Sequence, residues 1–182
     1  MSGWTTYAKV DQLIFLPMQS ISLATTTFVG QNLGKNQIQR ARKGVTVSLL
    51  LAIASTVVLM IPVLLFSPQI VAFFNGKPEV VEYGSMLLRW LSPFYILCCF
   101  NQIYSGALRG AGNSKAPMIF MLASFVAFRQ IYLFAMSNIW NEIIPIAMSY
   151  PAGWLLCSIL TGVYYHKVRL GKSRLVEDEK SE

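Results

Sequence analysis

The chain has 182 residues, of which 54% are hydrophobic and 13% are charged, and its formal net charge is +7. A soluble domain carries about 25% charged residues, so the composition argues against a soluble globular protein. The basic residues lie between long apolar runs instead of on one polar face, which argues against nucleic acid as a partner.

Five apolar runs are each long enough to cross a bilayer, which takes about 20 residues. We expect an all-α polytopic membrane bundle of five transmembrane helices within residues 1–169. The predicted spans, in chain order, are about 10–33, 45–66, 80–108, 118–138 and 143–165. Residues 170–182 have almost no apolar content, and we expect them to be a disordered cytoplasmic tail.

The basic residues predict the orientation of these spans. Eleven of the 15 lysines and arginines follow the first, third and fifth runs, which end on the same side of the membrane if there are five spans. Cytoplasmic segments carry the excess of lysine and arginine. The sequence therefore predicts a multi-pass protein of the cell membrane with a cytoplasmic C-terminus.

The first run carries polar residues on one helical face. Asp11, Gln12, Gln19, Ser22 and Thr26 fall within a single sector of the helix. Lipid cannot solvate these groups, so the face meets either other helices, through hydrogen bonds, or a water-filled cavity. The sequence leaves both readings open, and we take Gln12, Gln19, Ser22 and Thr26 as candidates for a substrate cavity.

Polar residues also interrupt two later runs. Asn101 and Gln102 lie in the third run and are further cavity candidates, although the small residues that follow also allow close helix packing. Arg129 lies near the centre of the fourth run, where a charge costs roughly 2.5–3.5 kcal/mol. The arginine therefore either pairs with a buried partner, acts as a gate, or donates hydrogen bonds to helix carbonyls.

The sequence offers no constellation for catalysis or metal binding. Cys98 and Cys99 are adjacent, Cys157 is alone, and His166 is the only histidine. No nucleophile with a base or phosphate-binding loop is visible either, so we expect no enzyme activity, no metal site and no cofactor.

Two motifs can be read in the chain. The first is the stretch 28–34 followed by Arg40-Ala41-Arg42, and the second is Pro78-Glu79-Val80 with the later stretch 105–113 and Pro117. In order and spacing they resemble the second helix of one half, and a later loop, of the multidrug and toxic compound extrusion family. The resemblance extends to about residue 169, and the stretch 128–132 is similar to the bacterial damage-inducible branch.

This resemblance implies a function and a place in a larger protein. Members have twelve helices in two six-helix lobes, and this chain resembles helices eight to twelve. Members export amphipathic, often cationic drug-like compounds in exchange for sodium ions or protons, from a central cavity by alternating access. The implied partners are membrane lipid, such small molecules, and the missing N-terminal lobe.

The chain departs from the family pattern where ion coupling is concerned. The first-helix aspartate of the family lies in the absent lobe, and the stretch 98–101 lacks the aspartate that some members carry on the tenth helix. No coupling residue can be transferred to this chain, and we expect that it does not transport alone. Two alternatives stay open: a lipid-linked sugar flippase of the same superfamily, and a non-transporting membrane fragment or assembly module.

Overall fold

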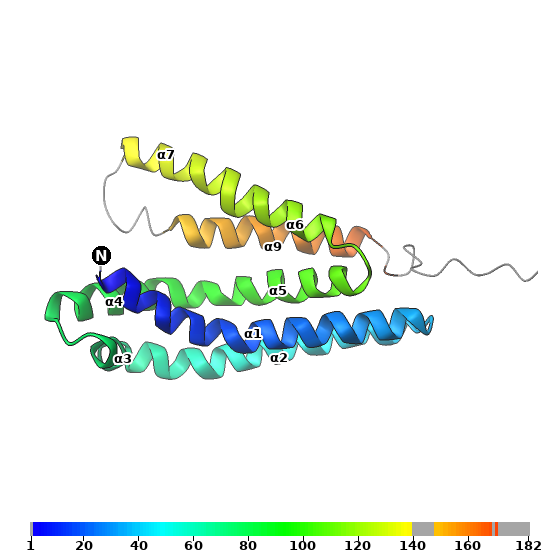
Figure 1. Ribbon diagram of the computed structural model, residues 1–182, viewed down its shortest axis with the longest axis horizontal. Coiled ribbons are helices and arrows are strands. Elements are labelled where there is room, and N and C mark those ends of the chain that lie inside the picture. The colour runs from blue at the N-terminus through cyan, green and yellow to red at the C-terminus, as the bar shows by residue number, and fades with distance from the viewer. Residues whose placement is uncertain (1, 140–147, 169, 171–182) are drawn as a thin grey trace, which may run out of the picture.

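Two long helices open the chain and lie side by side. A computed structural model describes residues 2–139, 148–168 and 170 (Figure 1). Helix α1 (Ser2–Gly34) and helix α2 (Ile38–Leu65) form an antiparallel pair. Asn36 ends α1 in the left-handed region, with φ 57°, a conformation that asparagine tolerates better than most residues. Its N–H donates to the Leu33 carbonyl, and the next N–H donates to the Asn32 carbonyl, which closes a Schellman turn.

The expected third span is not one helix. After the short helix α3 (Ser67–Phe74), the chain forms α4 (Pro78–Leu91), a single 3₁₀ turn η1 (Ser92–Phe94) and α5 (Tyr95–Gly110). The third predicted span, about 80–108, therefore contains a turn that the sequence pattern did not predict. Pro93 lacks an N–H and its ring displaces the carbonyl one turn earlier, so the α-helix gives way to a tighter turn there.

The last two rods run antiparallel to each other. Helix α6 (Lys115–Leu122), the π-helical segment η2 (Ala123–Phe128) and α7 (Arg129–Ile139) follow one another without a break. Helix α9 (Ser149–Lys167) returns along them and packs on α5. Figure 1 shows the resulting order of layers: the α1–α2 pair, then α5, then α9, then the rod from α6 to α7.

Aromatic side chains join the layers at one end of the bundle. The Phe15 ring of α1 meets the Tyr95 ring of α5 edge-on, with their centroids 5.6 Å apart. The Trp154 ring of α9 lies 5.7 Å from Tyr95 and 6.3 Å from Phe15. This cluster fixes three helices from separate parts of the sequence against one another.

The outer faces of the long helices are apolar. Exposed side chains include Leu23 on α1, Leu50 on α2, and Ile131 and Phe134 on α7. Contact between such large apolar faces and water is unfavourable, whereas the hydrocarbon core of a bilayer can cover them. Among the described residues, three helices are long and apolar enough to cross a membrane, and they are Ala8–Gly34, Ile38–Leu65 and Lys115–Met136.

The other two expected spans need a separate account. The run over 80–108 is divided by η1, so neither half is long enough alone. The run over 143–165 is described only from Met148, and its helix begins at Ser149. Of the expected tail, Leu170 is buried and residues 171–182 lie outside the described part.

Candidate functional site

The polar face of α1 packs directly on α5. The Ser22 Oγ donates to the Gln102 carbonyl at 2.7 Å. One turn later, the Thr26 Oγ1 lies 3.0 Å from both the Gly106 carbonyl and the Ser22 carbonyl. The bonds to Gln102 and Gly106 join residues that are 80 positions apart in the sequence, so each hydroxyl has a backbone partner on α5.

Glycines on α5 make this approach possible. A Cβ placed on Gly106 would lie 2.6 Å from the Ser22 carbonyl oxygen and 2.7 Å from its Oγ. A Cβ on Gly110 would clash with the Thr26 carbonyl oxygen. On α1, a Cβ placed on Gly30 would lie 3.3 Å from the Gly110 carbonyl oxygen. Small residues four apart on both helices are the usual means by which membrane helices approach closely.

Arg109 belongs to this contact, although the sequence pattern placed it in a loop. It lies in the last turn of α5, and its Nη2 donates to the Ser22 Oγ at 3.1 Å. Ser22 thus accepts from an arginine and donates to a backbone carbonyl. The four-residue spacing of Gly106 and Gly110 was the signal in the sequence that could have placed Arg109 on the helix.

A second polar contact joins α5 to α9. The Asn101 Oδ1 is buried and accepts from the Ser105 hydroxyl at 3.3 Å and from the Cys157 thiol at 3.2 Å. Nearby, the Ser158 Oγ donates to the Leu97 carbonyl at 2.6 Å. The sequence does not assign Cys157 or Ser158 to this contact, because cysteine and serine in an apolar run carry no distinctive pattern.

The cavity candidates therefore separate into two groups. Ser22, Thr26 and Asn101 have partners on neighbouring helices, and Gln102 is half-buried beside them. Gln12 and Gln19 have exposed side chains on α1. A cavity role for any of the six stays a prediction, but the exposed glutamines are the ones whose side chains are accessible.

Arg129 lies at the junction between the π-helical segment and α7. Its guanidinium carbon stands 3.8 Å from the centre of the Tyr150 ring on α9, which is a cation–π contact. Its Nε is buried and has no hydrogen-bond partner among the described residues, and the same holds for Ser124 Oγ and Ser149 Oγ. The arginine is thus stacked on an aromatic ring, and a wider π-turn precedes it.

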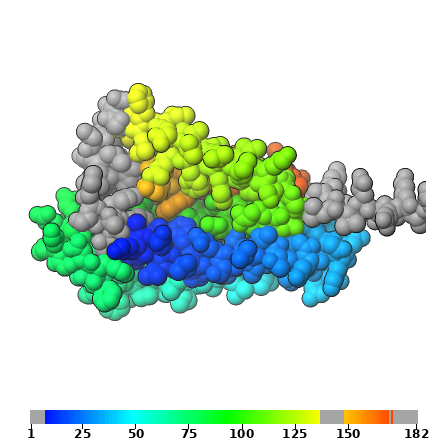
Figure 2. Space-filling view, in the orientation of Figure 1, coloured from blue at the N-terminus to red at the C-terminus, as the bar shows by residue number. Residues whose placement is uncertain are grey.

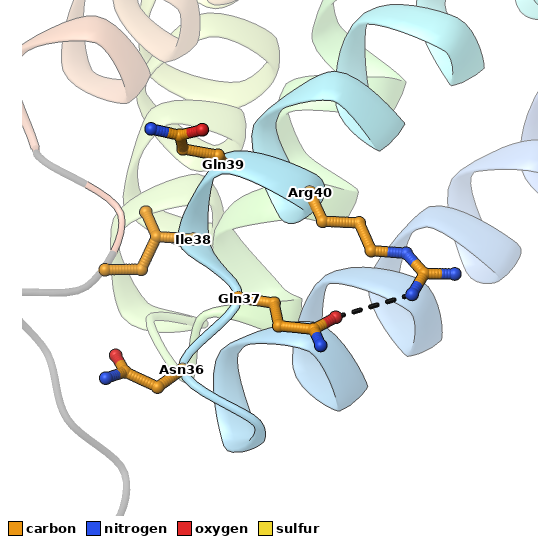
Figure 3. A pocket seen from close by; sticks show the side chains of 5 residues that line it. All are labelled: Asn36, Gln37, Ile38, Gln39 and Arg40. Carbon is orange, nitrogen blue, oxygen red and sulfur yellow. Dashed lines mark hydrogen bonds between the residues drawn. The ribbon is translucent and has the colours of Figure 1, made fainter.

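Two hollows open at the end of the bundle where α1 turns into α2. The larger, of about 620 Å³, is lined by residues 36–40, and Figure 3 shows Arg40 donating to the Gln37 Oε1 at 3.4 Å across its rim. The smaller, of about 260 Å³, lies between the start of α2 and the end of α9. The described residues hold no cluster of histidine, cysteine or carboxylate side chains that could bind a metal ion.

Comparison with known proteins gives a consistent family. The chain is 28% identical over 139 residues to the Probable multidrug resistance protein NorM of Thermotoga maritima, covering 76% of this chain and 27% of that protein. It is 23% identical over 179 residues to the Probable multidrug resistance protein YpnP of Bacillus subtilis, covering 98% of this chain and 40% of the relative. The chain therefore spans about two fifths of the relative's length or less.

The fold agrees with these relatives. A solved multidrug resistance MATE family transporter of the MOP superfamily, in an inward-facing conformation, superposes with a TM-score of 0.82 at 15% identity. The match covers 94% of this chain and 40% of that one. The MatE family model matches residues 1–134, which is most of the chain. The chain belongs to the MatE family of multi-pass membrane transporters.

Proposed function

We propose that this chain forms helices eight to twelve of a cation-coupled multidrug antiporter, in the C-terminal lobe, and that it exports amphipathic, often cationic compounds only together with an N-terminal lobe. The observation that carries the proposal is that 94% of this chain matches the fold of a transporter of which it covers only 40%. The names of the similar proteins favour multidrug export over the flippase alternative.

The packing supports a rigid half of an alternating-access machine. In such transporters, one helix bundle rocks against another around a binding site at their interface. Here α1, α5 and α9 are tied by hydrogen bonds and close glycine contacts, so they would move as one unit. Figure 2 shows a recess between α1 and the rod from α6 to α7, with parts of α5 and α9 at its floor. We assign this recess to the central cavity.

The proposal includes a topology of five spans in a bacterial inner membrane. Helices α4 and α5 together make the third span, with the break at Pro93 inside it. The end that carries the turn between α1 and α2 faces the cytoplasm, because its basic residues follow the positive-inside rule.

An efflux assay tests the function. The coding sequence upstream of Met1 would first be read for seven further apolar segments, and the complete protein would then be expressed in an efflux-deficient bacterium. We expect lower accumulation of ethidium, a cationic dye, and dependence on a sodium or proton gradient. The 182-residue chain alone, inserted at the same level, should leave dye accumulation unchanged. Normal dye accumulation in cells with a fully inserted complete protein would refute the proposal.

A further inference from the structure

The two ends of the bundle differ in charge. The four acidic residues before the tail lie in segments that are predicted to face away from the cytoplasm, and they are Asp11, Glu79, Glu82 and Glu142. The sequence has no acidic residue from 12 to 78 or from 83 to 141. At the other end, six of the described basic side chains are exposed, and they are Lys35, Arg40, Arg42, Lys43, Lys115 and Lys167, whereas Arg109 is half-buried.

The smaller hollow lies within this basic end. Its lining comprises Arg42 and Thr46 from α2, Tyr165 and His166 from the end of α9, and Val168 and Leu170 beyond it. In the part of the chain that the structure describes, Arg42 has no carboxylate partner, so its charge is available to a ligand. We call this hollow the Arg42 pocket.

The wall of the Arg42 pocket is held in place by neighbouring rings. The Tyr165 ring stacks on the Tyr104 ring of α5, with centroids 4.7 Å apart, and the His166 ring meets Tyr104 edge-on at 5.8 Å. On the opposite wall, the Thr46 Oγ1 donates to the Arg42 carbonyl at 3.3 Å, which orients the hydroxyl oxygen beside the arginine. The walls of the pocket are therefore held by contacts within the protein.

We propose that the Arg42 pocket binds the phosphate group of an anionic phospholipid. A guanidinium donates two parallel hydrogen bonds to phosphate oxygens, and the Tyr165 hydroxyl can add another donor. Val168 and Leu170 add apolar surface to the pocket, against which the glycerol part of the lipid can pack. Aromatic and basic side chains at helix ends lie at the depth of lipid headgroups, which commits the site to a lipid of the bilayer and not to a soluble phosphate.

Lipid binding to the purified full chain tests this site. Native mass spectrometry in detergent would count bound phosphatidylglycerol and, separately, phosphatidylcholine with the same acyl chains. We expect the chain to prefer phosphatidylglycerol, and Arg42→Gln to weaken its binding about fivefold, the factor that corresponds to about 1 kcal/mol for one basic residue near a membrane surface. Phosphatidylcholine binding should not change.

Lys77→Gln is the matched control, because it removes the same charge from an exposed residue at the opposite end. It should leave phosphatidylglycerol binding unchanged. Tyr165→Phe keeps every charge and the ring that stacks on Tyr104. It should weaken binding about threefold through one lost hydroxyl donor, so it tests the pocket even if Arg42→Gln fails to fold. Equal binding of the two lipids to the wild type, an equal loss in Lys77→Gln, or displacement by soluble glycerol phosphate would each overturn the proposal.

Discussion

The close contact between α1 and α5 makes Gly106 a sensitive position. Replacing it with alanine adds one methyl group at the point where the Cβ would lie 2.6 Å from the Ser22 carbonyl oxygen and 2.7 Å from its Oγ. The backbone oxygen cannot move aside as a flexible side chain could, so the two helices must separate. Separation would lengthen the bonds from Ser22 to Gln102 and from Thr26 to Gly106.

The size of the effect follows from three contributions. Overpacking a tight interior costs about 1–3 kcal/mol. Each interhelical hydrogen bond contributes about 0.6 kcal/mol in a membrane protein, so two weakened bonds add up to about 1 kcal/mol. Alanine in a helix is about 0.8–1 kcal/mol more favourable than glycine, which offsets part of the loss. We expect Gly106→Ala to lower the free energy of unfolding by about 1–3 kcal/mol.

Unfolding in mixed micelles with increasing sodium dodecyl sulfate would measure this loss, with tryptophan fluorescence as the signal. Trp154 is a suitable reporter, because it is buried and packs on Tyr95. Gly162→Ala is the control: its Cβ would lie 3.8 Å from the Tyr104 ring, an ordinary contact, so the helix preference of alanine should leave stability equal or raised. If Gly106→Ala is as stable as Gly162→Ala, the close α1–α5 contact does not exist as described.

Three further predictions concern charge, transport and topology. Arg129→Lys should retain most membrane insertion, whereas Arg129→Leu should reduce it, because leucine loses the cation–π contact with the Tyr150 ring. Tyr150→Phe should be tolerated better than Tyr150→Leu, since only the ring is needed for a contact of about 0.5–2 kcal/mol. Quantitative immunoblots of membrane fractions measure both, and full insertion of Arg129→Leu with resistance lost would instead make Arg129 a transport residue. In a complete transporter, Gln19→Leu should change drug resistance at normal expression, while unchanged resistance would exclude Gln19 from the cavity. A cysteine at exposed Gln39 should react with an impermeant maleimide only from the cytoplasmic side and one at exposed Gly76 only from outside, and the reverse pattern would refute the orientation.

The amino-acid sequence alone determined the class of this protein and its family. Long apolar runs with few charges are incompatible with a water-exposed surface, and they predicted an all-helical membrane bundle, which the helical fold and the MatE match support. The predicted end of the first span, about residue 33, lies next to the end of α1 at Gly34. Only the structure shows that the left-handed residue after this helix is Asn36, because glycine and asparagine are both common at helix ends.

The tertiary structure decided what each polar residue contacts. Helical periodicity put Gln19, Ser22 and Thr26 on one face of α1, but it could not say which neighbour covers that face. The approach of α5 along Gly106 gives Ser22 and Thr26 backbone partners and leaves Gln19 exposed. Likewise, the ring that stacks on Arg129 comes from α9, across the bundle. A hydrogen bond between residues 80 positions apart depends on how the helices pack, and periodicity within one helix carries no information about that packing.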